Sequence, residues 1–103
     1  GKKQVKETIN YYMGNANIMH EALTAMGFEV FGGKNAPYLW VKTPDGTDSW
    51  KFFEQMLYAV GVVCTPGVGF GPSGEGYIRL TAFGNREDCK EAMRRIKEWL
   101  KKA

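Results

Sequence analysis

The chain has 103 residues, of which 44% are hydrophobic and 24% are charged, and its formal net charge at pH 7 is +3. This length predicts one domain and is short for a metabolic enzyme built from two, while the hydrophobic fraction is too high for a disordered chain. Basic residues gather in Gly1–Lys6 and Arg94–Lys102, close to acidic ones. We interpret both segments as solvated helix faces rather than as a nucleic-acid surface.

The sequence carries few targeting or cross-linking signals. No apolar run reaches the eighteen or so residues of a membrane span, and the first residues lack the apolar core of a signal peptide. Cys64 and Cys89 make no disulfide framework and have no second ligand at zinc spacing. We expect a cytoplasmic protein with reduced cysteines and no bound metal. The chain also opens inside a helical pattern without a start methionine, so we expect a fragment of a larger protein.

The first predicted element is a helix. Apolar side chains recur at steps of four and three from Val5 to Met26, which places them on one stripe of a helix. Gly27 suits the left-handed residue that ends such a helix, with Phe28 as its hydrophobic partner. Gly14 costs a helix about 1 kcal/mol relative to alanine, so we expect it to mark a close helix contact.

Two strands are predicted next, over Phe28–Phe31 and Tyr38–Thr43, followed by a turn at residues 44–46. Thr47 or Asp48 is expected to cap a second helix that ends at Gly61. That helix is expected to bury Phe53, Leu57 and Val60. A short apolar strand, Val62–Thr65, should then lead into a glycine-rich loop.

The last strand is predicted over Tyr77–Phe83, and Asn85 is expected to cap a final helix. Alternation along this strand directs Ile78, Leu80 and Ala82 to one face and Tyr77, Arg79, Thr81 and Phe83 to the other. The inner stripe of the final helix is expected to be Cys89, Ala92, Met93, Ile96 and Leu100.

This order of elements predicts an α+β fold: a two-layer domain in which three helices cover one face of a small sheet. Alternation sends Leu39 and Val41 to the core, so the uncovered face should carry Tyr38 and Trp40 beside Tyr77 and Arg79. Aromatic side chains and an arginine on an open sheet face indicate a partner surface.

The segment Thr65–Gly84 carries the strongest functional signal. Five glycines between residues 67 and 76 let the loop lie close against another surface, and we expect Phe70 within it to be exposed. Residues 69–74 match G-x-G-x-x-G, but Pro72 and the strand that follows do not fit a dinucleotide site. His20 lacks the nucleophile or acid partner that catalysis would require, and Ser73 lacks the strand-to-helix turn of a nucleophile elbow.

Arg79 is the candidate binding residue. An arginine within a strand is costly to bury unless an anion meets it, and its planar guanidinium group matches a carboxylate in a bidentate fashion. The alternative is a structural arginine that reaches solvent from the sheet edge or pairs with Glu75.

Three segments support a family resemblance: GGKNAPYLWVKTP at residues 32–44, Ser49–Trp50, and Thr65–Gly84 with Arg86–Glu87. Together they resemble the C-terminal small domain of the LL-diaminopimelate aminotransferases, which belong to the fold type I enzymes that use pyridoxal 5′-phosphate. The resemblance covers essentially the whole chain, so residues 1–103 are expected to form that one domain of a larger two-domain enzyme.

The resemblance implies a transferase that moves an amino group between LL-2,6-diaminopimelate and 2-oxoglutarate, on the route to lysine and peptidoglycan. It assigns Arg79 to the substrate α-carboxylate. It also implies that the Schiff-base lysine, the other cofactor-binding residues and the phosphate site lie in a large domain, so this chain alone should bind no cofactor and be inactive. The expected partners are an amino acid or 2-oxo acid substrate, that large domain and a second subunit of a homodimer, with no nucleic acid and no membrane.

Other interpretations remain open on the residues alone. A fold type I aminotransferase with another substrate preference is the nearest. A stand-alone module could use Arg79 to hold an acidic metabolite. An interaction domain could dock a protein or single-stranded RNA on the aromatic face, although RNA would favour basic residues beside the aromatic ones.

Overall fold

The computed structural model describes residues 1–61, 64–82 and 84–102. Two long helices frame the described chain, α1 at Lys2–Ala25 and α3 at Arg86–Lys102. Between them lie the strands β1 (Val30–Gly32), β2 (Tyr38–Lys42), β3 (Thr65–Pro66) and β4 (Tyr77–Thr81), the helix α2 (Ser49–Glu54), the π-helix η1 (Gln55–Val60), and two 3₁₀ turns, η2 (Gly67–Phe70) and η3 (Pro72–Gly74).

The strands form one antiparallel sheet in the order β1-β2-β4-β3, so β4 lies between two neighbours. Arg79 of β4 pairs across the sheet with Trp40 on one side and with Thr65 on the other. The predicted strand over residues 62–65 is described only at its end, because Val62 and Val63 lie outside the described residues. Phe83, predicted on the open face, lies outside them as well.

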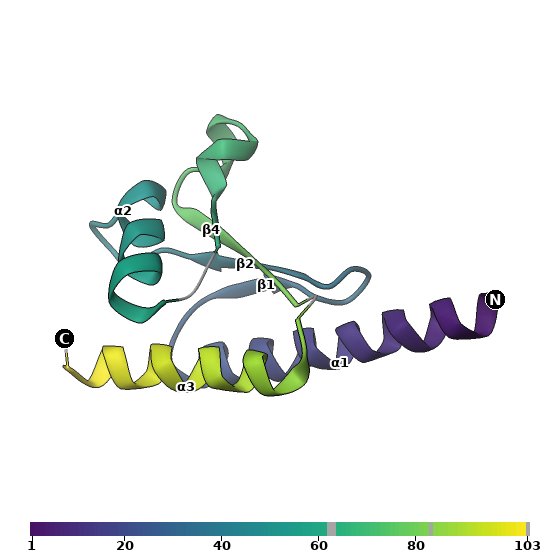
Figure 1. Ribbon diagram of the computed structural model, residues 1–103. Coiled ribbons are helices and arrows are strands. Elements are labelled where there is room, and N and C mark those ends of the chain that lie inside the picture. Colours follow the sequence, from purple (N-terminus) through teal and green to yellow (C-terminus); the bar gives the residue numbers. More distant parts are fainter. Residues whose placement is uncertain (62–63, 83, 103) are drawn as a thin grey trace.

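One hydrophobic core joins the sheet to all three helical segments. Leu39, Val41, Ile78, Leu80 and Ala82 supply the sheet side of this core, as the alternation predicts. The helical side is supplied by Ala16, Met19, Leu23, Phe52, Met56, Val60, Cys89, Met93 and Ile96. Helices α1 and α3 run side by side in the same direction, and η1 packs against α3 while α2 packs against the sheet (Figure 1). The predicted two-layer α+β architecture is therefore confirmed.

The predicted helix ends are also confirmed. Gly27 has a φ of +99°, and the amide of Phe28 donates to Leu23 O at 3.1 Å, which closes α1 in a Schellman-type turn. Asp48 caps α2 by accepting from the amide of Lys51 at 2.7 Å, and Asn85 caps α3 by accepting from the amide of Asp88 at 2.8 Å.

The prediction for the second helix was wrong for Phe53 and Leu57, whereas Val60 is buried as predicted. Phe52 and Met56 are fully buried, whereas Phe53 and Leu57 are only partly buried. The helix widens to a π-helix after Glu54, and the wider turn brings residues four apart more nearly onto one line. Phe52, Met56 and Val60 consequently share the inner face.

The apolar stripe of α1 is buried only in part. Its N-terminal half extends beyond the sheet (Figure 1), and Val5 and Ile9 are 59% and 50% exposed. Burial begins at Asn15 and Ala16, where Asn15 bonds to Ala82 and Gly84 just beyond β4 and the helix packs along α3. Neither long helix in the described ranges has the extended apolar stretch that crossing a bilayer requires.

Candidate functional site: an arginine between two aromatic rings

The open face of the sheet carries the residues that alternation predicted for it. Tyr38, Trp40, Tyr77 and Arg79 are partly buried, while their neighbours Leu39 and Ile78 turn into the core. Since successive side chains of a strand point to opposite faces, Arg79 projects away from the helices. The predicted direction of this side chain is confirmed.

The guanidinium group of Arg79 lies between two aromatic rings. Its Cζ is 4.6 Å from the centroid of Tyr38 and 4.4 Å from that of Phe70, both within cation–π range. Nε of Arg79 is a buried polar atom without a hydrogen-bond partner among the described residues. A buried donor in this state is costly, which is a reason to expect a ligand or another protein surface here.

Glu75 does not pair with Arg79. Its two carboxylate oxygens accept hydrogen bonds from Ser49, Oε2 from the hydroxyl at 2.7 Å and Oε1 from the amide at 3.2 Å. Within the part of the chain that the structure describes, no acidic group lies within ion-pair distance of Arg79. The pairing with Glu75 that the sequence left open is therefore absent from the described contacts.

The glycine-rich loop folds back on itself in the two 3₁₀ turns. A Cβ built on Gly67 would overlap the carbonyl oxygen of Gly74, and one on Gly74 would overlap the carbonyl oxygen of Gly67. The glycines were expected to let the loop lie close against another surface. At Gly67 and Gly74, that surface is another part of the same loop. The folded loop presents Phe70, which is 51% exposed as predicted and meets Trp40 edge-on with ring centroids 5.3 Å apart.

A shallow depression of about 390 Å³ opens beside these rings. It is lined by Phe31, Trp40, Phe70, Ser73, Gly74 and Tyr77. Phe31 and Tyr77 meet edge-on, with ring centroids 6.2 Å apart. A cation with an aromatic hollow beside it can hold a small molecule that has an acid group at one end.

Sequence reasoning missed a polar network at the other end of β4. Asn15 is fully buried, and its Nδ2 donates to the carbonyls of Ala82 and Gly84 at 3.1 and 2.8 Å. Its Oδ1 accepts from Nε of Arg86 at 3.0 Å, and Nη2 of Arg86 donates to Tyr11 O at 3.0 Å. Gly14, predicted to mark a close contact, is the one sequence signal for this site.

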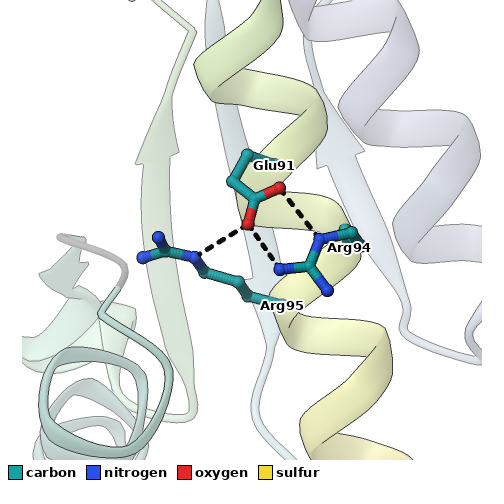
Figure 2. A network of polar contacts seen from close by, with 3 residues as sticks. All are labelled: Glu91, Arg94 and Arg95. Atoms are coloured by element: carbon teal, nitrogen blue, oxygen red, sulfur yellow. Dashed lines mark hydrogen bonds and ion pairs between the residues drawn. The ribbon is translucent and has the colours of Figure 1, made fainter.

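A second charged cluster lies on the exposed side of α3 (Figure 2). Glu91 bridges two arginines, with Arg94 Nη2 at 2.6 Å and Arg95 Nε at 3.2 Å from its Oε1. Hydrogen bonds from Arg94 and then Arg95 lower the pKa of the Glu91 carboxyl to about 2. All three side chains are largely solvated, so this network belongs to the helix surface and lies apart from Arg79.

Within the described ranges, the remaining chemistry-bearing residues form no site. Burial raises the pKa of the Cys64 thiol to about 11 and also raises that of Cys89, so both thiols stay protonated and behave as core side chains. His20 lies 3.5 Å from the hydroxyl of Thr24 and, within the described ranges, meets no acid or nucleophile. The described residues contain no group of three or more side chains able to hold a metal ion.

Known proteins match this chain over nearly its whole length. Residues 1–96 match the family described as "Aminotransferase class I and II". LL-diaminopimelate aminotransferases from Bacteroides thetaiotaomicron and Lawsonia intracellularis are 75% and 57% identical over 100 residues, which is 97% of this chain and 24% of each relative. The chain therefore spans about a quarter of the length of these relatives.

Solved structures agree with this match. The LL-diaminopimelate aminotransferase from Chlamydomonas reinhardtii superposes with a TM-score of 0.92 at 47% identity, over 96% of this chain and 24% of that one. An aromatic aminotransferase from Pyrococcus horikoshii superposes with a TM-score of 0.91 at 35% identity, over 97% of this chain and 27% of that one.

Proposed function

Since this chain belongs to the class I and II aminotransferase family, we propose that it is the C-terminal small domain of an LL-diaminopimelate aminotransferase. The whole enzyme would transfer an amino group between LL-2,6-diaminopimelate and 2-oxoglutarate in the cytoplasm, on the route to lysine and peptidoglycan. The 75% identity to a relative of that name supports this substrate pair.

Arg79 is the observation that carries the proposal. Its guanidinium group is on the open face, lies between two rings and has no acidic partner in the described ranges. A substrate α-carboxylate would supply the missing acceptor through charge-assisted hydrogen bonds, each contributing about 1.5–3 kcal/mol. Holding the carboxylate fixes the position of the α-carbon, so the contribution of this chain is binding and orientation.

Enzymes of this family use pyridoxal 5′-phosphate, which acts as the electron sink of the reaction. The residues of this chain do not fit that group by themselves. Every described lysine is exposed, and no lysine lines the depression beside Arg79. We therefore assign the covalent lysine and the phosphate site to the large domain of the same enzyme, and propose that the enzyme is a homodimer.

The test is substitution of Arg79 in the full-length aminotransferase. Arg79→Lys keeps the charge but loses the two-pronged geometry, so kcat/KM should fall by about tenfold or more, and Arg79→Ala should lower it further. Arg94→Lys on the exposed side of α3 is the matched control and should have little effect. Unchanged kcat/KM in Arg79→Ala would refute the carboxylate role.

A second substrate class is favoured by one observation, the aromatic lining of the depression. An aromatic amino acid could place its ring there, and the fold matches that of an aromatic aminotransferase. Comparing kcat/KM of the full-length enzyme for LL-diaminopimelate and for phenylalanine distinguishes the two. A preference for phenylalanine would replace the proposed substrate pair while leaving the role of Arg79 intact.

A further inference from the structure

The two rings beside Arg79 come from different parts of the fold. Tyr38 begins β2 and is held by its ladder with β4, whereas Phe70 ends the 3₁₀ turn η2 in the glycine-rich loop. Cζ of the guanidinium lies 4.6 Å from the first ring centroid and 4.4 Å from the second. A guanidinium held between two rings loses rotational freedom and keeps its donor edge in a fixed direction.

The position of Phe70 depends on the glycine loop. Gly67 and Gly74 lie so close that neither can carry a Cβ, and their contact closes the loop that places Phe70 on Trp40 and Arg79. The loop therefore sets the geometry of the Arg79 side chain on β4, through the position of Phe70.

The nitrogens of the Arg79 guanidinium are the donors that a ligand would meet. Nε is buried and finds no acceptor among the described side chains. The terminal nitrogens are not among the buried unpaired atoms of the described residues. Together with Nε, they are the donors that an acid group would meet.

We propose that Phe70, together with Tyr38, is a positioning residue that holds the guanidinium of Arg79 with its two terminal nitrogens toward the substrate carboxylate. This inference rests on the proposed function of Arg79. Phe70 acts through Arg79, and its stacking contributes to the affinity of the enzyme for carboxylic acids.

The experiment uses the full-length aminotransferase and glutarate, a dicarboxylic acid that cannot be transaminated, with Kd measured by calorimetry. Phe70→Leu keeps an apolar side chain but removes the ring, and should weaken glutarate binding about tenfold. Phe70→Tyr keeps the ring and should stay within about twofold. Tyr58→Leu removes a ring that is 82% exposed on η1 and serves as the matched control.

A double-mutant cycle separates positioning from other roles. In an Arg79→Lys enzyme, the further change Phe70→Leu should weaken binding by less than about twofold, since there is no guanidinium left to hold. In the Arg79-containing enzyme, Phe70→Leu should raise KM for the amino donor more than it lowers kcat. Thermal midpoints confirm that each variant is folded, and Phe70→Met replaces Phe70→Leu if the latter is not.

Two results would overturn the inference itself. Unchanged glutarate affinity in Phe70→Leu would show that the ring is not needed. An equal loss in the wild-type and Arg79→Lys backgrounds would show that Phe70 acts directly on the ligand or on the fold. Unchanged glutarate affinity in Arg79→Lys would instead refute the proposed role of Arg79. Failure of the inference about Phe70 can therefore be told apart from failure of the proposed function.

Discussion

Gly14 lies directly beneath the guanidinium group of Arg86: a Cβ on Gly14 would come within 2.6 Å of Arg86 Nη2. That nitrogen is not free to move, because it donates to Tyr11 O, and Nε of the same side chain donates to Asn15. A single glycine in α1 thus makes room for the arginine that joins α1 to the start of α3.

The effect of Gly14→Ala on the free energy of unfolding should depend on whether residue 86 is arginine or methionine. In an Arg86→Met chain, alanine should stabilise the fold by about 1 kcal/mol through helix propensity. With Arg86 present, that gain should be cancelled or reversed, because the guanidinium must leave its hydrogen bonds. Urea unfolding of the four chains of this cycle gives the coupling, which should be about 1–2 kcal/mol. If the two substitutions change the free energy of unfolding additively, the contact between Gly14 and Arg86 does not affect stability.

Asn15→Leu should destabilise the chain by about 2–4 kcal/mol, since it removes the hydrogen bonds to the carbonyls of Ala82 and Gly84 and from Nε of Arg86, the first of them in a buried site. Asn17→Leu, at an exposed position two residues along the same helix, should change the free energy of unfolding by less than about 0.5 kcal/mol. Chemical denaturation measures both. Equal effects at the two positions would contradict a special role for Asn15.

Gly74→Ala should destabilise the chain by about 1–3 kcal/mol, because its Cβ would overlap a backbone atom of Gly67, which cannot give way as a side chain could. Gly69→Ala is the matched control: it lies in the same loop, has no atom within 4 Å of an added Cβ and has no positive φ. Tryptophan fluorescence should report the Trp40–Phe70 contact. A change in Gly69→Ala as large as that in Gly74→Ala would argue against the close contact.

The Glu91 network predicts a pH dependence of stability. The pKa of this carboxyl is about 2 in the folded chain against an ordinary value of 4.5. A lowered pKa stabilises the fold above the unfolded-state value, so this contribution should be present above pH 4.5 and be lost as the pH falls toward 2.

Glu91→Gln should flatten the fall in stability between pH 4.5 and pH 2, as measured by urea unfolding at several pH values. The effect should shrink in about 1 M salt, because all three side chains are solvated. Glu7→Gln on α1 is the control, since Glu7 has no ion pair among the described residues. Identical pH profiles for wild type and Glu91→Gln would exclude the network as the cause.

The sheet faces and helix ends followed from local rules. Alternation placed Arg79 opposite Ile78 and Leu80, and the left-handed turn at Gly27 needs only a glycine where the apolar stripe stops. The buried face of α2 and η1 did not follow, because periodicity cannot distinguish an ordinary α-helix from the wider π-helix that aligns Phe52 with Met56.

The site was predictable only in part. Arg79 was identified because a cation inside a strand is unusual. Its stacking on Phe70 depends on how the glycine loop closes, and local sequence patterns do not predict that closure. Asn15 gave no signal at all, since an asparagine beside an apolar stripe is as often solvated as buried. The role of Arg79 and the assignment to a C-terminal small domain remain predictions.

The interior position of β4 makes correct folding depend on the placement of Arg79. A slip of one residue against β2 and β3 would drive the guanidinium into the core and expose Ile78 and Leu80. One residue inserted or deleted within Tyr77–Thr81 should therefore destabilise the fold as well as displace Arg79, unless a β-bulge restores the register. Substitutions can change the neighbours of this arginine one at a time, whereas a shift of the arginine itself by one position exchanges the two faces of β4.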